Sequence, residues 1–460
     1  SHNYLSSKPK QRLVYAGRII ASSISEEWLL PRWLYTVLLT LAFPFVFLRL
    51  WLRGRTSPAY RLRWRERLGR APSDASMLTR PIWLHAVSLG ETLAARPLVE
   101  AIREHYPDVP LLITTMTPTG SAQVRALWGD DNADFAHVYA PYDFPWAVRR
   151  FLAHWQPRAL VIMETELWPN TLVAARARGI PVMLANARLS ERSARGYERA
   201  GLLGAELMRQ LTVVAAQDEA TAERFCLLGV PSNQVVRTGS VKFDLAVPVH
   251  LHDDAARWRV AWSLLQRSVW VAASTHAGED EIVLAAHRAI LQTHPEALLI
   301  LVPRHPERFD AVAKLISSEG LQAVRRSSHE LVGANTQVLL ADSMGELLLW
   351  LAMAKVAFVG GSLLAPGGGH NALEPLAVGV STLTGPHYTN FQSINDTLIA
   401  AGALTVVSSA AELAQAVLAR FDDPELLQRQ RAAGAAVMAA NQGAVGRQLE
   451  LLAPWLGEGA

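Results

Sequence analysis

The chain has 460 residues, of which 50% are apolar and 18% are charged. This balance excludes an intrinsically disordered protein, and the length is sufficient for two or three domains. Because Cys226 is the only cysteine, the chain can form no intramolecular disulfide and no cysteine-based zinc site. Cys226 lies in the apolar run FCLLGV and is predicted to belong to a core.

The charge is distributed unevenly along the chain. Residues 1–100 contain 15 of the 44 Lys and Arg but 6 of the 41 Asp and Glu, a net charge of +9. The other 360 residues therefore carry −6. The pI near 9.1 reflects one basic segment, so we expect no nucleic-acid partner.

An apolar segment precedes most of these arginines. Residues 33–48 contain no charged side chain, and counting through Leu52 gives about 20 residues, the usual length of a membrane-spanning helix. Trp33 and Trp51 stand where interfacial aromatic residues belong. We predict a membrane anchor over 33–54, with a full span slightly favoured over shallow insertion. The alternative is a buried helix followed by a solvated basic helix.

The arginines at the end of this segment fit the cytoplasmic side of a membrane and attract anionic lipid head groups. They are Arg49, Arg53, Arg55, Arg61, Arg63, Arg65 and Arg67. Residues 1–32 are interpreted as an N-terminal extension or an expression remnant.

The rest of the chain alternates short apolar runs with helical stretches. Fully apolar short strands separated by helices indicate parallel sheets that are covered on both faces. We therefore predict an α/β protein with Rossmann-like domains at 55–247 and 258–440 and a helical tail at 441–460. The predicted strands are 82–87, 111–116, 160–164, 181–187 and 212–217 in the first half, and 268–274, 297–303, 336–342, 356–361 and 380–385 in the second.

Ligands of open parallel sheets bind outside the carboxyl ends of the strands. The first polar motif at such a position is HAVSLGE, in which Glu91 begins a predicted helix. The positive end of that helix keeps the carboxylate ionised and able to accept a proton. The alternative is that Glu91 only caps the helix.

Three further motifs of the first half carry charged groups. In METELWPN, Glu164 and Glu166 stand at a strand end, where acids bind cations or hydroxyl groups or cap the helix before Pro169. The polar run 186–193 could hold an anionic acceptor. Lys242, in GSVKFD, suits a leaving phosphate, and surface ion pairs are the alternative for both.

The second half offers PRHPER, DSMGE and GGGHNALEP. Glycines allow close backbone approach, and the helix start after them would present free N–H groups to a phosphate, while Glu374 could hold ribose hydroxyls. A plain glycine loop is the alternative. The histidines show no clear ligand spacing, and the acidic run 130–134 is expected to be a loop, so we predict no metal site.

Nine motifs in this order resemble the Kdo transferases of lipopolysaccharide synthesis, where Kdo is 3-deoxy-D-manno-octulosonic acid. The similarity extends from the apolar segment near residue 33 to about residue 400. The motifs are HAVSLGE, TTMTPTG, YAPYD, METELWPN, NARLSERS, GSVKFD, PRHPE, GGGHNALEP and GPHYTNF.

The resemblance implies a GT-B glycosyltransferase with two Rossmann-like domains and a cleft between them. It implies CMP-Kdo as donor, a lipid A precursor (lipid IVA) as acceptor, and inversion at the anomeric carbon. By motif match, Glu91 is the general base, and Glu164 and Lys242 support the transition state.

The resemblance also implies the nucleotide-binding residues, which are Pro303, Arg304, Met344, Gly345, Glu346, Asn371, Ala372, Leu373 and Glu374. It implies no metal and no other cofactor, with inner-membrane lipids as partners at the cytoplasmic face of the bacterial inner membrane. Two alternatives stay open: another GT-B nucleotide-sugar transferase or epimerase, and a non-catalytic, membrane-tethered nucleotide-binding scaffold.

Overall fold

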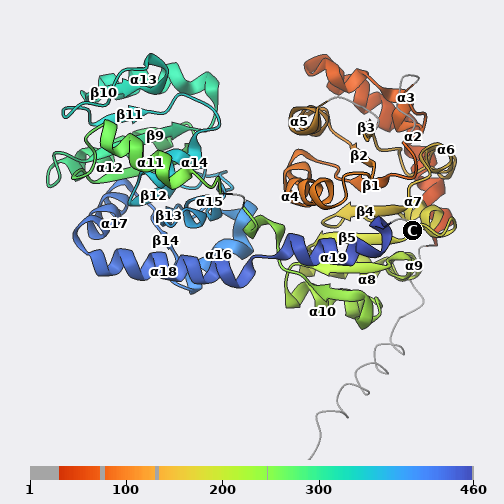
Figure 1. Ribbon diagram of the computed structural model, residues 1–460. Helices are drawn as coiled ribbons and strands as arrows, with labels where there is room; N and C mark the ends of the chain where they lie inside the picture. The colour runs from red at the N-terminus through yellow and green to blue at the C-terminus, as the bar shows by residue number, and fades with distance from the viewer. Residues whose placement is uncertain (1–30, 73–77, 130–133, 246, 458–460) are drawn as a thin grey trace, which may run out of the picture. The chain divides into compact units, whose positions relative to one another are not determined.

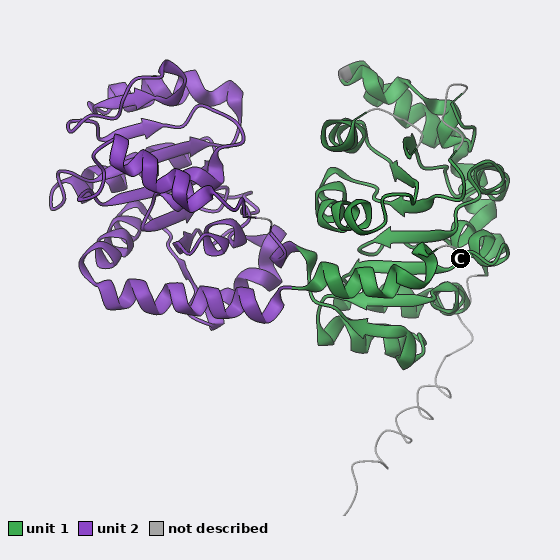
Figure 2. Cartoon of the chain, in the orientation of Figure 1, with its two compact units in different colours: residues 1–241, 443–460 green, residues 242–442 purple. Residues whose placement is uncertain are grey.

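The computed structural model describes residues 31–72, 78–129, 134–245 and 247–457. The chain forms two compact units, unit 1 with residues 1–241 and 443–460, and unit 2 with residues 242–442 (Figure 2). Each unit is an α/β structure built on one parallel sheet.

Unit 1 contains a seven-stranded parallel sheet in the order β3-β2-β1-β4-β5-β6-β7 (Figure 1). Side chains alternate between its faces, so that Trp83 packs in one core and its neighbours Ile82 and Leu84 pack in the other. The strands are β1 (Ile82–His85), β2 (Leu111–Thr115), β3 (Phe135–Tyr139), β4 (Ala159–Met163), β5 (Val182–Ala187), β6 (Val213–Ala216) and β7 (Val235–Arg237).

Helices cover both faces of this sheet, as the apolar strands predict. They are α4 (Leu89–His105), α5 (Pro118–Trp128), α6 (Pro145–Trp155), α7 (Pro169–Arg176), α8 (Glu191–Arg199), α9 (Leu202–Gln210), α10 (Glu219–Leu227) and α19 (Ala444–Leu456), with the short turn η3 (Ser232–Gln234). The turn η4 (Val241–Phe243) contains the last residue of this part of unit 1 and the first two of unit 2.

The C-terminal helix α19 belongs to unit 1. It packs against α4, and Leu449, Leu452 and Leu456 are buried in the core that α4 shares with the sheet. The predicted tail at 441–460 contains this helix, which packs on unit 1 because one of its faces is apolar.

The apolar segment forms one helix, α2 (Arg32–Thr56), followed by η2 (Pro58–Arg61) and α3 (Trp64–Arg67). By length and composition α2 is able to cross a membrane. Many of its large apolar side chains are exposed, namely Trp33, Val37, Leu38, Leu41, Phe45, Leu48, Trp51 and Leu52. The proposed extension 1–32 lies, except for its last two residues, outside the described residues.

Unit 2 repeats the plan with the sheet order β10-β11-β9-β8-β12-β13-β14, again entirely parallel. Two cores, one on each face, contain most of its buried apolar side chains. The strands are β8 (Val269–Thr275), β9 (Leu298–Pro303), β10 (Ala323–Arg325), β11 (Val338–Leu340), β12 (Val356–Val359), β13 (Ser381–Thr384) and β14 (Leu404–Val406).

The helices of unit 2 lie mostly between consecutive strands, and α17 and α18 follow the last one. They are α11 (Leu251–Ala261), α12 (Glu279–Leu291), α13 (Phe309–Ser318), α14 (Leu347–Ala352), α15 (Leu373–Ala377), α16 (Gln392–Ala400), α17 (Ala410–Asp422) and α18 (Pro424–Asn441), with the turns η5 (Pro306–Arg308), η6 (Arg326–Ser328) and η7 (Thr389–Phe391).

The prediction that Cys226 belongs to a core is wrong. Cys226 is exposed on α10, whereas the adjacent Phe225 is fully buried. Consecutive residues of a helix point in directions about 100° apart, and here Phe225 faces the core while Cys226 faces away from it.

Candidate active site

The carboxyl edge of the first sheet gathers three acidic side chains. The chain runs from β1 to β2 on one side, and β4 pairs with β1 on the other, so a topological switch point lies between β1 and β4. Such a point is where open parallel sheets bind ligands. Glu91 follows β1, and Glu164 and Glu166 follow β4, so the structure brings the two predicted acidic motifs to this edge.

Glu91 is held by the first turn of α4. Its Oε2 accepts a hydrogen bond from the Val87 N–H at 2.8 Å, and its Oε1 accepts one from the Ser88 hydroxyl at 2.9 Å. The Ser88 Oγ in turn accepts the Glu91 N–H at 3.3 Å, which makes Ser88 the N-cap of the helix. This reciprocal arrangement resembles a capping box and fixes the carboxyl group in one orientation.

Burial raises the pKa of Glu91 to about 7, against the two hydrogen bonds, which lower it. The nearby Glu166 and Glu164 raise it further because two more negative charges disfavour a third. A carboxyl group that titrates near neutral pH is suited to take a proton during a reaction. Glu91 therefore takes part in capping α4, as the alternative predicted, and it also has a strongly raised pKa.

The loop after β4 is held in a strained conformation. Glu164 has φ +57°, a left-handed conformation that is uncommon for a residue other than glycine, asparagine or aspartate. Its N–H donates to the Ala185 carbonyl at 3.0 Å, and the Thr165 hydroxyl donates to the Arg188 carbonyl at 2.6 Å. Strain of this kind concentrates at functional sites. Neither acid caps α7, which begins at Pro169 with Trp168 as its N-cap residue.

The polar run 186–193 divides into structural and exposed residues. Asn186 is fully buried, and its Oδ1 accepts the Val241 N–H at 3.2 Å. Ser190 caps α8 by accepting the Ser193 N–H. Arg188, directly after β5, and Arg192, in α8, are both exposed, so two cations of this run are accessible to an anionic acceptor.

In unit 2, the predicted nucleotide-binding residues also follow parallel strands. Pro303 ends β9 and Arg304 follows it, the loop 344–346 follows β11, and the run 371–374 comes after β12. Strands β9 and β11 are neighbours, and β8 separates β9 from β12. All three groups therefore lie at the carboxyl edge of the second sheet.

The loop 344–346 is held by an arginine, Arg326, that the sequence did not indicate. Arg326 donates to both carboxylate oxygens of Glu346, at 3.2 and 3.0 Å, and its guanidinium lies 5.0 Å from the centroid of the Trp258 ring. Gly345 has φ +86°, a conformation that glycine adopts without strain. Met344 is 62% exposed and is free to contact a ligand.

The glycine loop 367–369 is closed by backbone hydrogen bonds. The Gly368 and Gly369 N–H groups both donate to the Gly361 carbonyl, at 3.0 and 2.8 Å, so they close the loop and are not offered to a phosphate. The helix that follows, α15, begins only at Leu373 and has five residues. The Asn371 Oδ1 accepts the Leu373 N–H at 3.2 Å.

Two other predicted residues lie in unit 2. Burial raises the pKa of Glu374, and a hydrogen bond with Asn371 opposes that shift. Lys242 follows the end of unit 1, and its Nζ lies 5.1 Å from the centroid of the Phe391 ring.

A pocket of about 560 Å³ opens at the switch point of the second sheet, and the sequence did not predict it. The loops after β8 and β12 form most of its wall, with η7 on one side. Glu279 stands at its base and is 1% exposed. Its two oxygens accept four backbone N–H groups at 2.7–2.8 Å, from residues 276, 361, 362 and 363.

Two of the seven arginines predicted to face a membrane or an acceptor lie inside unit 1. Arg67 is 1% exposed, and its guanidinium lies 4.0 Å from the centroid of the Tyr139 ring. Arg63 pairs with the buried Glu66 at 2.6 Å and donates to the His137 carbonyl. The prediction is wrong for Arg67 because an aromatic ring and burial replace water around it, and Arg63 serves mainly to hold this segment. Arg49, Arg53, Arg55, Arg61 and Arg65 are exposed.

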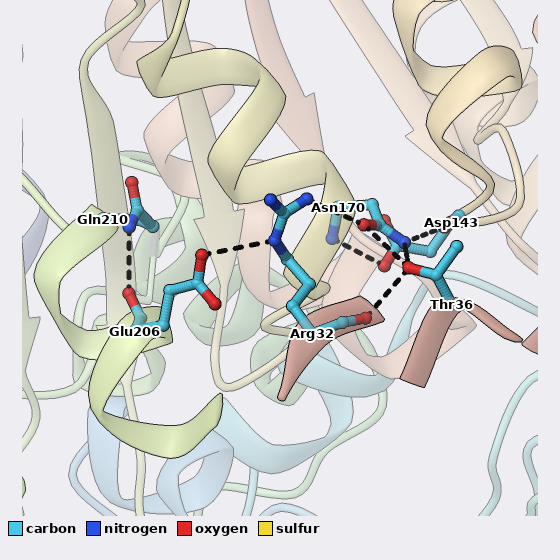
Figure 3. A network of polar contacts seen from close by, with 6 residues as sticks. All are labelled: Arg32, Thr36, Asp143, Asn170, Glu206 and Gln210. Carbon is cyan, nitrogen blue, oxygen red and sulfur yellow. Dashed lines mark hydrogen bonds and ion pairs between the residues drawn. The ribbon is translucent and has the colours of Figure 1, made fainter. Parts of the chain in front are cut away.

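A polar network fixes the start of α2 on unit 1 (Figure 3). Arg32 forms an ion pair with Glu206 at 3.2 Å and donates to the Asn170 Oδ1 at 3.2 Å, which the Thr36 hydroxyl also contacts. Asn170 donates in turn to Asp143, whose pKa burial raises to about 6. The beginning of α2 is therefore attached to the unit that carries Glu91.

Within the ranges that the structure describes, no group of three or more His, Cys, Asp or Glu side chains could hold a metal ion. Most of the acidic run 130–134, for which we predicted no metal, lies outside these ranges.

Comparison with solved structures supports the fold. A UDP-GlcNAc 2-epimerase from Neisseria meningitidis, bound to UDP-GlcNAc, has a TM-score of 0.52 at 14% identity, covering 82% of this chain and 99% of that one. The two units thus have a GT-B-like α/β fold.

The sequence comparisons are more specific. Residues 62–245 match the family model of 3-deoxy-D-manno-octulosonic-acid transferases. The 3-deoxy-D-manno-octulosonic acid transferase of Haemophilus influenzae is 43% identical over 426 residues, which cover 92% of this chain and 99% of the relative. The C-terminal CMP-Kdo binding domain of WaaA from Acinetobacter baumannii is 42% identical, covering 41% of this chain and 97% of that one with a TM-score of 0.40. The chain belongs to the Kdo transferase family.

Proposed function

We infer that this Kdo glycosyltransferase moves Kdo from CMP-Kdo to the lipid A precursor lipid IVA, with inversion at the anomeric carbon and Glu91 as general base. The observation that carries this proposal is the Glu91 carboxyl group, which is oriented by two hydrogen bonds at a switch point and has a pKa of about 7. The resemblance of the motifs supplies donor and acceptor.

The proposed step is a single displacement. The acceptor hydroxyl oxygen bonds to the anomeric carbon of Kdo while its proton passes to the Glu91 carboxylate, and the bond from that carbon to the CMP phosphate oxygen breaks. CMP leaves with the electron pair of that bond. Lys242 stabilises the charge that the phosphate gains, and Glu164 supports the transition state on the acceptor side.

The nucleotide is proposed to bind in unit 2, between Arg304 and the run 371–374, with the loop 344–346 against the base. The ordered Arg326–Glu346 contact supports this assignment because it holds that loop in place before any ligand arrives. No metal or other cofactor takes part in the proposed step.

The test uses purified full-length protein, CMP-Kdo and one defined lipid IVA acceptor, with mass spectrometry of the lipid products. We expect the acceptor mass to increase by Kdo units and CMP to be released. Absence of both would contradict the proposal. A protein that transfers sugar from UDP donors, or that binds nucleotide without turnover, would support another GT-B activity or a scaffold instead.

We also infer that α2 anchors the enzyme in the cytoplasmic leaflet of the inner membrane, lying along the surface. One face of the helix rests on unit 1: Tyr35 donates to Asp143 at 3.1 Å, and the Phe43 and Phe144 rings are 5.2 Å apart. The other face exposes apolar side chains from Trp33 to Leu52. A helix attached to a polar unit along one face favours shallow insertion over the full span that length alone favoured.

The anchor is tested by flotation of the protein with vesicles of anionic phospholipid. Leu41→Asp should weaken binding at least about tenfold, since a buried leucine contributes about 1.5–3 kcal/mol. Leu227→Asp, at an exposed leucine of α10, is the matched control and should float normally. Alkaline carbonate should extract the native protein from membranes, whereas retention would indicate a full span.

A further inference from the structure

Two histidines meet in the pocket of unit 2. His276 follows β8 and His370 follows β12, so they come from the two sides of the switch point. Their Nε2 atoms are 2.8 Å apart, within hydrogen-bond distance, and both line the pocket. The His305 ring lies 5.3 Å from that of His276. His276 and His370 are 94 positions apart in sequence, so only the fold brings them together.

The pocket suits a negatively charged group. Glu279 is the one acidic residue of its lining, and four backbone N–H groups already occupy both of its oxygens. After β9, the positive charge of Arg304 acts on both histidines, and that of Arg308, which forms an ion pair with Asp280, acts on His276. Thr389 and Asn390 supply further polar groups to the wall. A ligand would therefore meet imidazole, hydroxyl and amide groups, with cations nearby.

We propose that the His276–His370 pair binds the carboxylate of the donor's sugar and so selects an acidic sugar. The proposal rests on the proposed function, because it takes CMP-Kdo as the donor. Kdo is an acid, so it carries a carboxylate that a neutral sugar lacks. The pocket is next to the expected nucleotide site, since His370 directly precedes Asn371 and the β8 loop lies between the loops of Arg304 and Asn371.

The pair has a protonation state that such a ligand would change. One proton between two Nε2 atoms makes a neutral hydrogen bond, in which one ring donates and the other accepts. A second proton would give the pair a positive charge, which a bound carboxylate stabilises. The free protein disfavours that charge: burial lowers the pKa of His276, and burial and the neighbouring His276 lower the pKa of His370 to about 4.

Of the charged groups that act on the two histidines, only Glu279 favours their protonation. Arg304 and His305, both after β9, lower the pKa of both histidines, and Arg308 lowers that of His276, whereas Glu279 of α12 raises the pKa of both. The pair is therefore neutral at pH 7 without ligand. Binding of a carboxylate raises the pKa, so donor binding takes up as much as one proton, and donor affinity falls by up to tenfold for each unit of rising pH.

The experiment is titration calorimetry of the full chain with CMP and, separately, with CMP-Kdo, at pH 6, 7 and 8 in two buffers of different ionisation enthalpy. For the native protein we expect proton uptake with CMP-Kdo and none with CMP. CMP carries the phosphate but not the sugar carboxylate, so the two ligands distinguish the two anions that this pocket could hold.

Two substitutions separate charge from hydrogen bonding. His370→Gln keeps a neutral amide near the Nε2 position but cannot gain a proton, and His370→Asn removes that contact as well. Both should abolish proton uptake and weaken CMP-Kdo binding, by about tenfold for His370→Asn and less for His370→Gln, with CMP affinity changed less than twofold. The control is His329→Asn, at an exposed histidine with φ +59°, which asparagine tolerates.

Each other result overturns the proposal. Equal losses for CMP and CMP-Kdo would assign the pocket to the phosphate, and unchanged CMP-Kdo binding by both variants would remove the pair from the donor site. Thermal unfolding of each variant, with His276→Gln as a second substitution, identifies a loss that is due to misfolding. Failure of the native protein to transfer Kdo would contradict the proposed function, whereas failure of this inference leaves native transfer intact.

Discussion

Glu91 and Glu279 occupy equivalent places in the two units. Each follows the first strand of its sheet and a glycine, as Gly90-Glu91 and Gly278-Glu279, and each lies at the start of a helix, α4 or α12. Both side chains are nearly inaccessible to water, at 9% and 1% exposure. From fold position and residue type alone, the two glutamates would receive the same role.

Their partners differ. Glu279 accepts four N–H groups, three of which come from the loop after β12, so it holds that loop against the β8 loop. Glu91 accepts one N–H and one hydroxyl, and two other acids are near it. A carboxylate whose oxygens are all engaged maintains structure, whereas one with free capacity and a raised pKa is available for proton transfer.

The largest expected effect is that of Glu91→Gln on sugar transfer. The amide cannot accept the proton of the acceptor hydroxyl, so we expect kcat to fall by about 10²–10⁴-fold, with CMP binding and thermal stability retained. Radiolabelled Kdo transfer and CMP titration measure the two quantities. Glu100→Gln, on the exposed face of the same helix, is the matched control. Transfer within tenfold of the native rate would exclude Glu91 as the base.

Glu279→Gln should show the reverse pattern in unit 2. The amide nitrogen would face two N–H donors, so buried hydrogen bonds are lost, and we expect the free energy of unfolding to fall by about 3 kcal/mol. Denaturant unfolding measures this change, and Glu281→Gln, an exposed neighbour on α12, should be nearly neutral. Loss of transfer at full stability would instead place Glu279 among the reacting groups.

The pH dependence of the reaction distinguishes the role of Glu91, at the carboxyl edge of the first sheet, from that of the histidine pair, at the carboxyl edge of the second. Glu91 must be ionised to act, so at saturating donor kcat should fall tenfold for each pH unit below about 7. The same raised pKa makes the contribution of Glu91 to stability present in acid and lost as pH rises toward 7. If the histidine pair binds the donor, kcat/KM should also fall at alkaline pH, giving a bell shape. A kcat that is flat between pH 5 and 8 would contradict the role of Glu91.

Glu164→Gly should separate stability from activity within unit 1. Glycine adopts φ +57° without a steric penalty, so stability should be retained or rise by up to about 1 kcal/mol, while loss of the carboxylate lowers transfer about tenfold or more. Gln156→Gly, at φ +43° after α6, is a control that should affect stability alone. Calorimetry and the transfer assay give both values, and undiminished transfer would remove Glu164 from the site.

The sequence predicted the interior of both sheets and missed their margins. All ten predicted strands are present, and the four unpredicted ones, β3, β7, β10 and β14, are the edge strands of the two sheets. Three of these have only three residues and are partly exposed, so their apolar signal is weak. β3 is buried but contains His137, which interrupts its apolar run.

The parts of the candidate site whose interacting residues are close in sequence could be predicted from the sequence. Glu91 and Ser88 are three residues apart, so the capping arrangement is visible in sequence. Three of the four N–H donors to Glu279 lie 82 to 84 residues away, and His370 lies 94 residues from His276, so no spacing rule indicates these contacts. Arg67 was misassigned for the same reason, since Tyr139, which covers it, is distant in sequence.

The return of α19 to unit 1 has a consequence for synthesis. Residues 242–442 are continuous, so unit 2 can fold as soon as they have left the ribosome, whereas the α4 face of unit 1 waits for Leu449, Leu452 and Leu456. Domains usually fold in the order of synthesis. Here unit 1 is synthesised first but is completed last, and until α19 has been made the unit exposes the apolar surface that this helix covers.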